Sequence, residues 1–155
     1  MAASLRSKGY EEFVPLYRSY NRWSDRLRDV SVPLFPGYVF CRFDPAQRLP
    51  IVTTPGVVSV VGLGKTPQPV ETAEMEAIQA LIKSGLPAIP WPYLKAGAPV
   101  RIEQGALEGI EGILTAVKSE CRVVLSITLL HRSVAVEIDR GWVRPINRPG
   151  LRPCL

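Results

Sequence analysis

The sequence predicts an α+β domain joined by a proline-rich connector to a small antiparallel β-barrel. Pro87, Pro90 and Pro92 lie close together, and each fixes its own backbone and disfavours a helix at the preceding residue. Strand and helix patterns both occur before these prolines, whereas only short strand patterns follow them. We therefore expect domains at residues 1–86 and 96–147, a connector at 87–95 and a tail at 148–155.

The strands of the first domain are predicted from segments rich in tyrosine, phenylalanine and valine. These segments are residues 11–20, 37–43 and 57–62. Asp44 and Pro45 can begin a short helix after the second of them. Helices packed on one face of such an antiparallel sheet give an α+β domain.

A longer helix is predicted over residues 72–84. Thr72 can cap its first turn, and glutamates at 74 and 76 suit the positive end of the helix dipole. An apolar stripe runs along one face, formed by Met75, Ile78, Leu81 and Ile82. Gly85 can end the helix in the left-handed conformation.

The barrel is predicted from five short strands after the prolines. In residues 133–139, Val134, Val136 and Ile138 fall on one face of a strand, and residues 121–128 alternate in the same way. Such alternation is typical of half-buried strands. The other three segments are residues 99–103, 112–118 and 142–146. Five short strands in this length favour a small antiparallel barrel.

The composition favours a globular binding protein. Hydrophobic residues make up 46% and charged residues 21% of the chain. The net charge of +5 suits a polyanionic partner such as nucleic acid, although small basic domains are also common. There is no run of roughly 18 apolar residues, so we expect no membrane helix. The three cysteines, Cys41, Cys121 and Cys154, form neither a disulfide framework nor a CxxC motif, which favours a reducing cytoplasm.

No pattern indicates catalysis. His131 is the only histidine, and no serine or cysteine motif stands near it in the sequence. Neither a glycine-rich phosphate loop nor the spacing of metal ligands is present. We therefore expect a protein without enzymatic activity, cofactor or metal.

Two segments resemble one known family. The segment Leu-Phe-Pro-Gly-Tyr-Val-Phe at residues 34–40, followed by Thr-Pro-Gly-Val at 54–57, resembles the N-terminal domain of NusG proteins. Val-Arg-Ile-Glu-Gln-Gly at 100–105 and Leu-Glu-Gly-Ile-Glu-Gly-Ile-Leu at 107–114 resemble the KOW motif of the same family. The resemblance covers nearly the whole chain. It implies a ferredoxin-like domain joined to an SH3-like barrel, and a factor for transcription elongation or antitermination.

The resemblance implies a polymerase-binding site in the first motif. In NusG proteins this region forms an apolar patch that grips the coiled-coil clamp helices of RNA polymerase. The matching residues here are Phe35, Pro36, Gly37 and Tyr38. We expect the aromatic side chains to be exposed anchors, as at other binding hot spots. Val39 and Cys41 are expected in the sheet core.

A basic stretch between two predicted strands is a candidate nucleic-acid site. Arginines interleaved with aromatics can hold phosphates and stack on unpaired bases. The residues are Arg18, Arg22, Trp23, Arg26 and Arg28. Related antiterminators contact the non-template DNA strand from this part of the domain. The alternative is a solvated hairpin in which Asp25 and Asp29 balance part of the charge.

The barrel carries two further features. Gly105, Gly109 and Gly112 suit the KOW loop, where we expect structural roles, with Gly112 at a point where a side chain would clash. The resemblance implies that the loop Leu129, Leu130, His131 and Arg132 contacts Rho or a small-subunit ribosomal protein. Leu130 stands where housekeeping members have an aromatic residue, and a buried barrel leucine is the alternative.

The chain also departs from the family. Family members begin with a strand and a full helix, whereas this sequence starts near the end of that helix. We expect that the domain lacks its first strand because the true protein begins some tens of residues earlier. Within the family, the arginine-rich stretch and Leu130 favour a specialised paralogue of the RfaH/UpxY kind. The alternatives are a housekeeping NusG and a ribosome-associated KOW protein, although Lys118 is the only lysine after Gly97.

Overall fold

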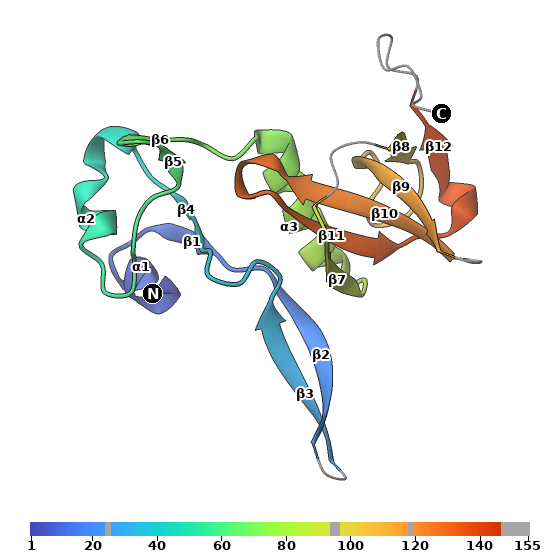
Figure 1. Cartoon of the computed structure of the whole chain (residues 1–155), viewed down its shortest axis with the longest axis horizontal. Coiled ribbons are helices and arrows are strands. Elements are labelled where there is room, and N and C mark those ends of the chain that lie inside the picture. Colours follow the sequence, from blue (N-terminus) through green and yellow to red (C-terminus); the bar gives the residue numbers. More distant parts are fainter. Residues whose placement is uncertain (24–25, 94–96, 118–119, 147–155) are drawn as a thin grey trace. The chain divides into compact units, whose positions relative to one another are not determined.

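The chain forms two compact units, each described by itself below. The computed structural model describes residues 1–23, 26–93, 97–117 and 120–146, and only the backbone at 20–23, 26–29, 116–117 and 120 (Figure 1). The first unit comprises Met1–Pro15 and Phe35–Pro69. The second comprises Leu16–Leu34 and Val70–Leu155. Antiparallel strands and a few helices make up both units, which confirms the predicted α+β class.

The first unit combines short helices with two small antiparallel ladders. Its elements are α1 (Ala2–Ser7), β1 (Glu11–Phe13), β4 (Phe40–Arg42), the 3-10 helix η1 (Pro45–Gln47), α2 (Leu49–Val52), β5 (Gly62–Leu63) and β6 (Thr66–Pro67). Strand β1 pairs with β4, and β5 pairs with β6. The predicted helix start at Asp44 is confirmed, because its carboxylate accepts a hydrogen bond from the Ala46 amide at 2.9 Å.

The core of the first unit is small and combines apolar packing with one buried hydroxyl. Leu5, Phe35, Phe40 and Ile51 are buried there. Thr54 is also buried, and the Lys8 ammonium donates to its Oγ1 at 2.8 Å and to the Pro50 carbonyl at 2.9 Å. Because Lys8 comes from the chain after α1 and Thr54 from the turn after α2, these bonds tie the two helical segments together.

The second unit begins with a two-stranded hairpin. It consists of β2 (Leu16–Trp23) and β3 (Arg26–Pro33), which pair in register from Leu16 opposite Pro33 to Trp23 opposite Arg26. This hairpin holds the arginine-rich stretch of the sequence.

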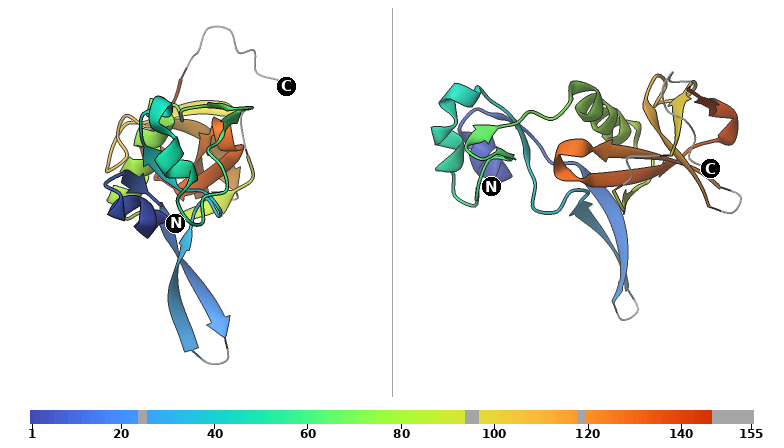
Figure 2. Two further views of the ribbon diagram at one scale, coloured as in Figure 1. Left: turned by 90° about the vertical axis from the view of Figure 1, so that its left-hand side faces the viewer. Right: turned by 45° about the horizontal axis from the view of Figure 1, so that its top comes forward.

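The rest of the second unit is a six-stranded antiparallel sheet and one helix. The strands are β7 (Ala88–Trp91), β8 (Ala98–Ile102), β9 (Glu111–Val117), β10 (Glu120–Ile127), β11 (Arg132–Glu137) and β12 (Val143–Pro145). They lie in the order β12-β8-β9-β10-β11-β7, which is compatible with an SH3-like barrel. Helix α3 (Thr72–Ser84) packs against β10 (Figure 2). No helix in the described residues is long and apolar enough to span a membrane.

Helix α3 has the predicted limits, but its cap differs from the prediction. Ala77, Ile78 and Leu81 are buried, and Gly85 ends the helix at a φ of +69°. The prediction that Thr72 is the cap is wrong. Glu71 precedes the first turn and makes no side-chain capping bond, while its carbonyl accepts from the Met75 amide at 3.0 Å.

Several predicted strands differ from those observed. The segment 11–20 is divided into β1 and β2, because Val14 and Pro15 separate pairing with β4 from pairing with β3. The segment 37–43 is shortened to β4. In residues 57–62 only Gly62 belongs to a strand, so the third predicted strand is wrong. Strand β11 is buried on both faces from Ser133 to Val136, whereas its alternation predicts one exposed face.

The segment predicted as a connector contains a strand. Strand β7 pairs with β11, with Ala88 opposite Val136 and Trp91 opposite Ser133. Pro90 lacks an amide donor, which is compatible with the position of β7 at the end of the strand order. Helix α3, which the sequence groups with the first domain, belongs to the same compact unit as the barrel. The domain limits at residues 86 and 96 stay predictions.

We expect Gly112→Ala to destabilise the barrel by about 1–3 kcal/mol, the range typical of overpacking. A Cβ atom at this position would lie 2.8 Å from the Val124 carbonyl oxygen and 2.5 Å from a Val123 methyl group. Urea unfolding followed by tryptophan fluorescence measures the change. Gly141→Ala is the control, since its nearest neighbour would be the Asp139 carboxylate at 3.3 Å. Equal stability of the two variants would contradict the close approach at Gly112.

Candidate partner-binding surfaces

The turn at residues 34–38 is anchored by Phe35 rather than by Tyr38. Phe35 is 1% exposed and stands edge-on to Phe40, with ring centroids 5.6 Å apart. Phe13 lies on the other strand of the ladder, 6.2 Å from Phe40. The expectation that Phe35 is an exposed anchor is therefore wrong. Its ring packs in the small core of the first unit, because burying an aromatic ring there stabilises the fold.

The same turn presents its next three residues to the outside. Pro36 and Gly37 are exposed and Tyr38 is half-buried. The Tyr38 amide donates to the Phe35 carbonyl at 3.1 Å, and Gly37 takes a φ of +85°, a conformation that favours glycine. The buried Phe35 thus fixes a rigid turn with a proline and a tyrosine at its surface.

Other apolar side chains of the first unit are also exposed. Leu49 is 68% exposed, Val58 98% and Leu63 76%. Singly exposed aliphatic side chains are common on protein surfaces and do not by themselves mark a binding site. These three come from α2, the segment after it, and β5.

The β2–β3 hairpin holds the predicted nucleic-acid site. Its backbone register sets Trp23 opposite Arg26, and Arg28 opposite Asn21. Arg18 is exposed on β2. The side chains of Arg22, Trp23, Arg26 and Arg28 lie outside the described part of the structure. The strand pairing therefore brings the backbone of residues 18–23 next to that of residues 26–31 in one hairpin.

The three motif glycines shape the connection between β8 and β9. Gly105 and Gly109 have φ values of +86° and +85°. A Cβ atom on Gly105 would lie 2.7 Å from the Trp142 ring, so the glycine lets this ring pack on the loop backbone. The Gly109 amide donates to the Ile102 carbonyl at 2.8 Å. These are structural roles, and a ligand is not needed to account for them.

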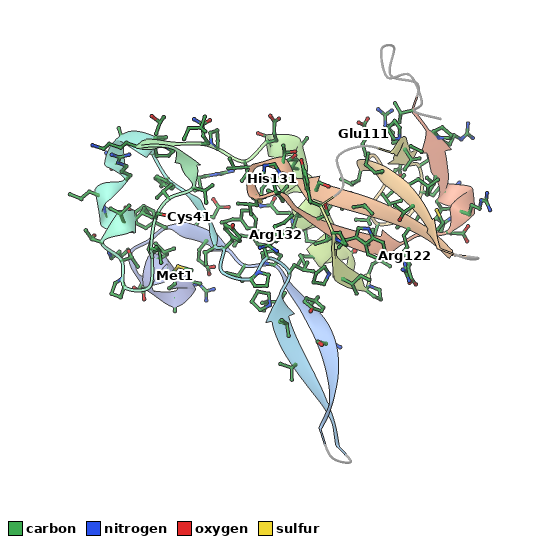
Figure 3. All side chains as sticks on the ribbon, in the orientation of Figure 1. Met1, Cys41, Glu111, Arg122, His131 and Arg132 are labelled. Carbon is green, nitrogen blue, oxygen red and sulfur yellow. The ribbon has the colours of Figure 1, made fainter. Side chains whose placement is uncertain are left out.

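The turn between β10 and β11 was predicted to offer an apolar contact to a partner protein, but its surface is mainly polar. Thr128–Leu130 forms the 3-10 helix η2, and His131 follows with a φ of +48°. Leu130 is 9% exposed and Leu129 half-buried, whereas His131 and Arg132 are exposed. Figure 3 labels His131 and Arg132. The Leu130 side chain is thus packed inside the barrel, and the polar residues His131 and Arg132 face the solvent.

Two residues that the sequence did not predict as site residues contact this turn. The Glu74 carboxylate of α3 accepts hydrogen bonds from the Thr128 amide at 3.1 Å and from the Thr128 hydroxyl at 2.5 Å. The Tyr93 ring stands edge-on to His131, with centroids 4.9 Å apart. No short-range pattern could reveal the first contact, because it joins residues 54 positions apart.

The described cysteines are poorly suited to nucleophilic chemistry. Burial raises the pKa of the Cys41 thiol, and the neighbouring Glu12 carboxylate raises it further. Burial likewise raises the pKa of Cys121, an effect that Arg140 opposes. Both thiols are therefore protonated at neutral pH, the form that does not attack an electrophile.

Comparison with known proteins identifies relatives of the chain. The sequence profile of the family described as "Transcription termination factor nusG" matches residues 1–79. The transcription termination/antitermination protein NusG of Thermus thermophilus is 27% identical over 155 residues, which cover 92% of this chain and 84% of that protein. The protein of the same name from Deinococcus radiodurans is 28% identical over 134 residues, covering 74% and 70%.

We expect Phe35→Ala to destabilise the first unit by about 3–5 kcal/mol, as for other buried phenylalanines. Tyr38→Ala should cost about 1 kcal/mol, because its ring is only half-buried. Chemical denaturation of both variants, followed by circular dichroism, measures the difference. A loss no larger for Phe35→Ala than for Tyr38→Ala would contradict the packing described for the aromatic turn.

Proposed function

The chain belongs to the NusG family of transcription termination and antitermination factors, and we propose that it binds the clamp helices of RNA polymerase and favours elongation over pausing or termination. Members of this family are transcription factors, not enzymes. The observation that carries the proposal is the family match over residues 1–79, which includes the turn with Pro36 and Tyr38 at its surface.

The geometry of this turn supports a contact with helices. Phe35 and the Gly37 conformation hold the backbone in one shape, so a partner would not have to order it. Tyr38 offers a ring with a polar tip, a common composition for a binding hot spot. A stable complex would bury about 1,200–2,000 Å² in total, and exposed aliphatic residues such as Leu49 could extend the contact.

The factor would act by differential binding. A protein shifts an equilibrium only by binding one state better than another. Tighter binding to polymerase with its clamp closed over nucleic acid would stabilise elongating complexes relative to paused ones. No catalytic group is required for this effect.

The β2–β3 hairpin would contact the non-template DNA strand. Its arginine-rich sequence and the net charge of +5 support this role. Single-stranded DNA is bound by cations that track phosphates and by aromatic rings that stack on bases. Arg18, Arg22, Arg26 and Arg28 would supply the first, and Trp23 the second.

The barrel would recruit a second factor through the turn at residues 129–132. Rho and a small-subunit ribosomal protein are the candidates. Because it is carried on the same chain as the polymerase-binding unit, the barrel would act at a raised effective concentration. We favour a specialised antiterminator, since Leu130 is buried where an exposed aromatic contact is expected of housekeeping members. A housekeeping NusG is the alternative.

Tyr38→Ala should weaken binding to purified bacterial core RNA polymerase by at least about tenfold, the loss expected for a hot-spot aromatic. Tyr10→Ala is the matched control, because Tyr10 is also a half-buried tyrosine of the first unit. Titration of labelled chain with polymerase measures both affinities. Equal loss in the two variants, or no binding by the unaltered chain, would overturn the proposed site.

Replacing Arg18, Arg22, Arg26 and Arg28 by glutamine should reduce the salt dependence of binding to single-stranded DNA. Each lost phosphate contact lowers the slope of log affinity against log salt by about 0.7. Fluorescence anisotropy at several salt concentrations measures the slope. The control for net charge replaces four arginines outside the hairpin by glutamine, namely Arg42, Arg101, Arg140 and Arg144. The same slope change in this variant would contradict a role for the hairpin.

A further inference from the structure

We propose that the turn between β10 and β11 recognises a carboxylate-bearing segment of a protein partner through Arg132 and His131, and that Glu74 is a positioning residue for this turn. The inference rests on the proposed role of the barrel as a recruiting module and names the chemistry of its partner. It follows from which side chains the turn buries, which it presents, and how its backbone is held.

The turn presents polar groups because its apolar group is buried. Leu130 is 9% exposed at the end of η2, so it cannot fill a partner's apolar pocket without unfolding the turn. Arg132 and His131 are exposed beside it, and Leu129 is half-buried. Recognition at this turn must therefore begin with the cationic and aromatic groups.

Arg132 differs from the other arginines on the barrel strands because it forms no salt bridge in the described residues. Arg101 pairs with Glu111 at 2.5 Å, Arg122 with Glu137 at 3.0 Å, and Arg144 with Glu103 at 2.7 Å. Within the described residues Arg132 has no carboxylate partner. A guanidinium with its donors free is suited to a bidentate bond with an incoming carboxylate.

His131 is held in an uncommon backbone conformation. Its φ of +48° lies in the left-handed region, and it is the one residue other than glycine with a positive φ among those described. Its ring is also placed by Tyr93, edge-on at 4.9 Å. Backbone strain that the surroundings maintain is a feature of functional sites, and a turn fixed before binding loses less entropy on binding.

Glu74 holds the start of the turn. Its carboxylate accepts from the amide and the hydroxyl of Thr128, and α3 itself is fixed by the burial of Ile78 and Leu81. Hydrogen bonds to a charged group are stronger than those between neutral groups. Glu74 thus fixes η2 from outside the hairpin, and through η2 it fixes the positions of His131 and Arg132.

A carboxylate on a protein fits this turn better than a nucleic-acid backbone. Polyanions are bound by several cations that each neutralise a phosphate. Here Arg132 is the single permanent positive charge of the turn. One carboxylate next to an apolar side chain would instead match Arg132 together with the half-buried Leu129 and Tyr93.

The test is a nuclear magnetic resonance titration of the full chain with three probes. These are the end-blocked peptide Gly-Leu-Glu-Phe-Asp-Gly, its neutral counterpart with glutamine and asparagine, and a short oligothymidylate. We expect the acidic peptide to shift the amide signals of residues 128–132 and to bind at least about fivefold more tightly than the neutral one, as for loss of a charged hydrogen bond. Equal binding of the two peptides, or tighter binding of the oligothymidylate at these signals, would overturn the proposal.

Variants assign the effect to individual residues. Arg132→Gln should reduce the affinity for the acidic peptide to that for the neutral peptide, whereas Arg140→Gln, at another exposed arginine without a described partner, should leave it unchanged. If Arg132→Gln binds the acidic peptide as the unaltered chain does, the assignment is wrong.

A double-mutant cycle tests the positioning role of Glu74. Glu74→Gln and Thr128→Val should each lower the affinity for the acidic peptide by about threefold. The double variant should lose no more affinity than either single variant, because the two residues act through one contact. Additive losses would contradict this role. Polymerase binding by the Arg132→Gln chain should be unchanged, so failure of the peptide result and failure of the polymerase proposal can be told apart.

Discussion

The packing of helix α3 against strand β10 is the interaction on which the second unit depends. Ile78 and Leu81 of the helix are fully buried, and so are Val123 and Ile127 of the strand. Burial of aliphatic side chains of this size contributes about 1.5–3 kcal/mol each, which is substantial for a domain with a small core. The same packing brings Glu74 to Thr128 and thereby holds the turn that ends β10.

The helix therefore connects two parts of the chain that the sequence separates. The family profile ends at residue 79, within α3, while the helix continues to Ser84 and packs on the barrel. In the first unit the corresponding constraint is the aromatic contact of Phe35 with Phe40, which fixes the turn carrying Tyr38. Both candidate protein-binding turns are thus held by buried side chains next to them, and their exposed residues are free to contact a partner.

Local patterns predicted much of this architecture. The apolar stripe that includes Ile78 and Leu81 predicted the helix α3, and Gly85 predicted its end. The alternation at Val134 and Val136 predicted the strand β11. Features set by distant contacts could not be predicted. Phe35 is buried against Phe40, whose position is set by the pairing of β4 with the distant strand β1, where Phe13 lies opposite Phe40. Strand β7 forms because β11 offers it an edge, and Glu74 meets Thr128 only after α3 has docked. For the same reason the sequence predicted Phe35 as a binding anchor, although Pro36 and Tyr38 occupy the surface of that turn.

Hydrogen–deuterium exchange of the full chain, alone and with core RNA polymerase, tests the central claim most directly. Exchange slows where binding covers a surface or suppresses local opening. Binding through the aromatic turn predicts protection concentrated at residues 34–42 of the first unit, with the turn at 128–132 left unchanged. Protection confined to the barrel, or no protection anywhere on addition of polymerase, would contradict it.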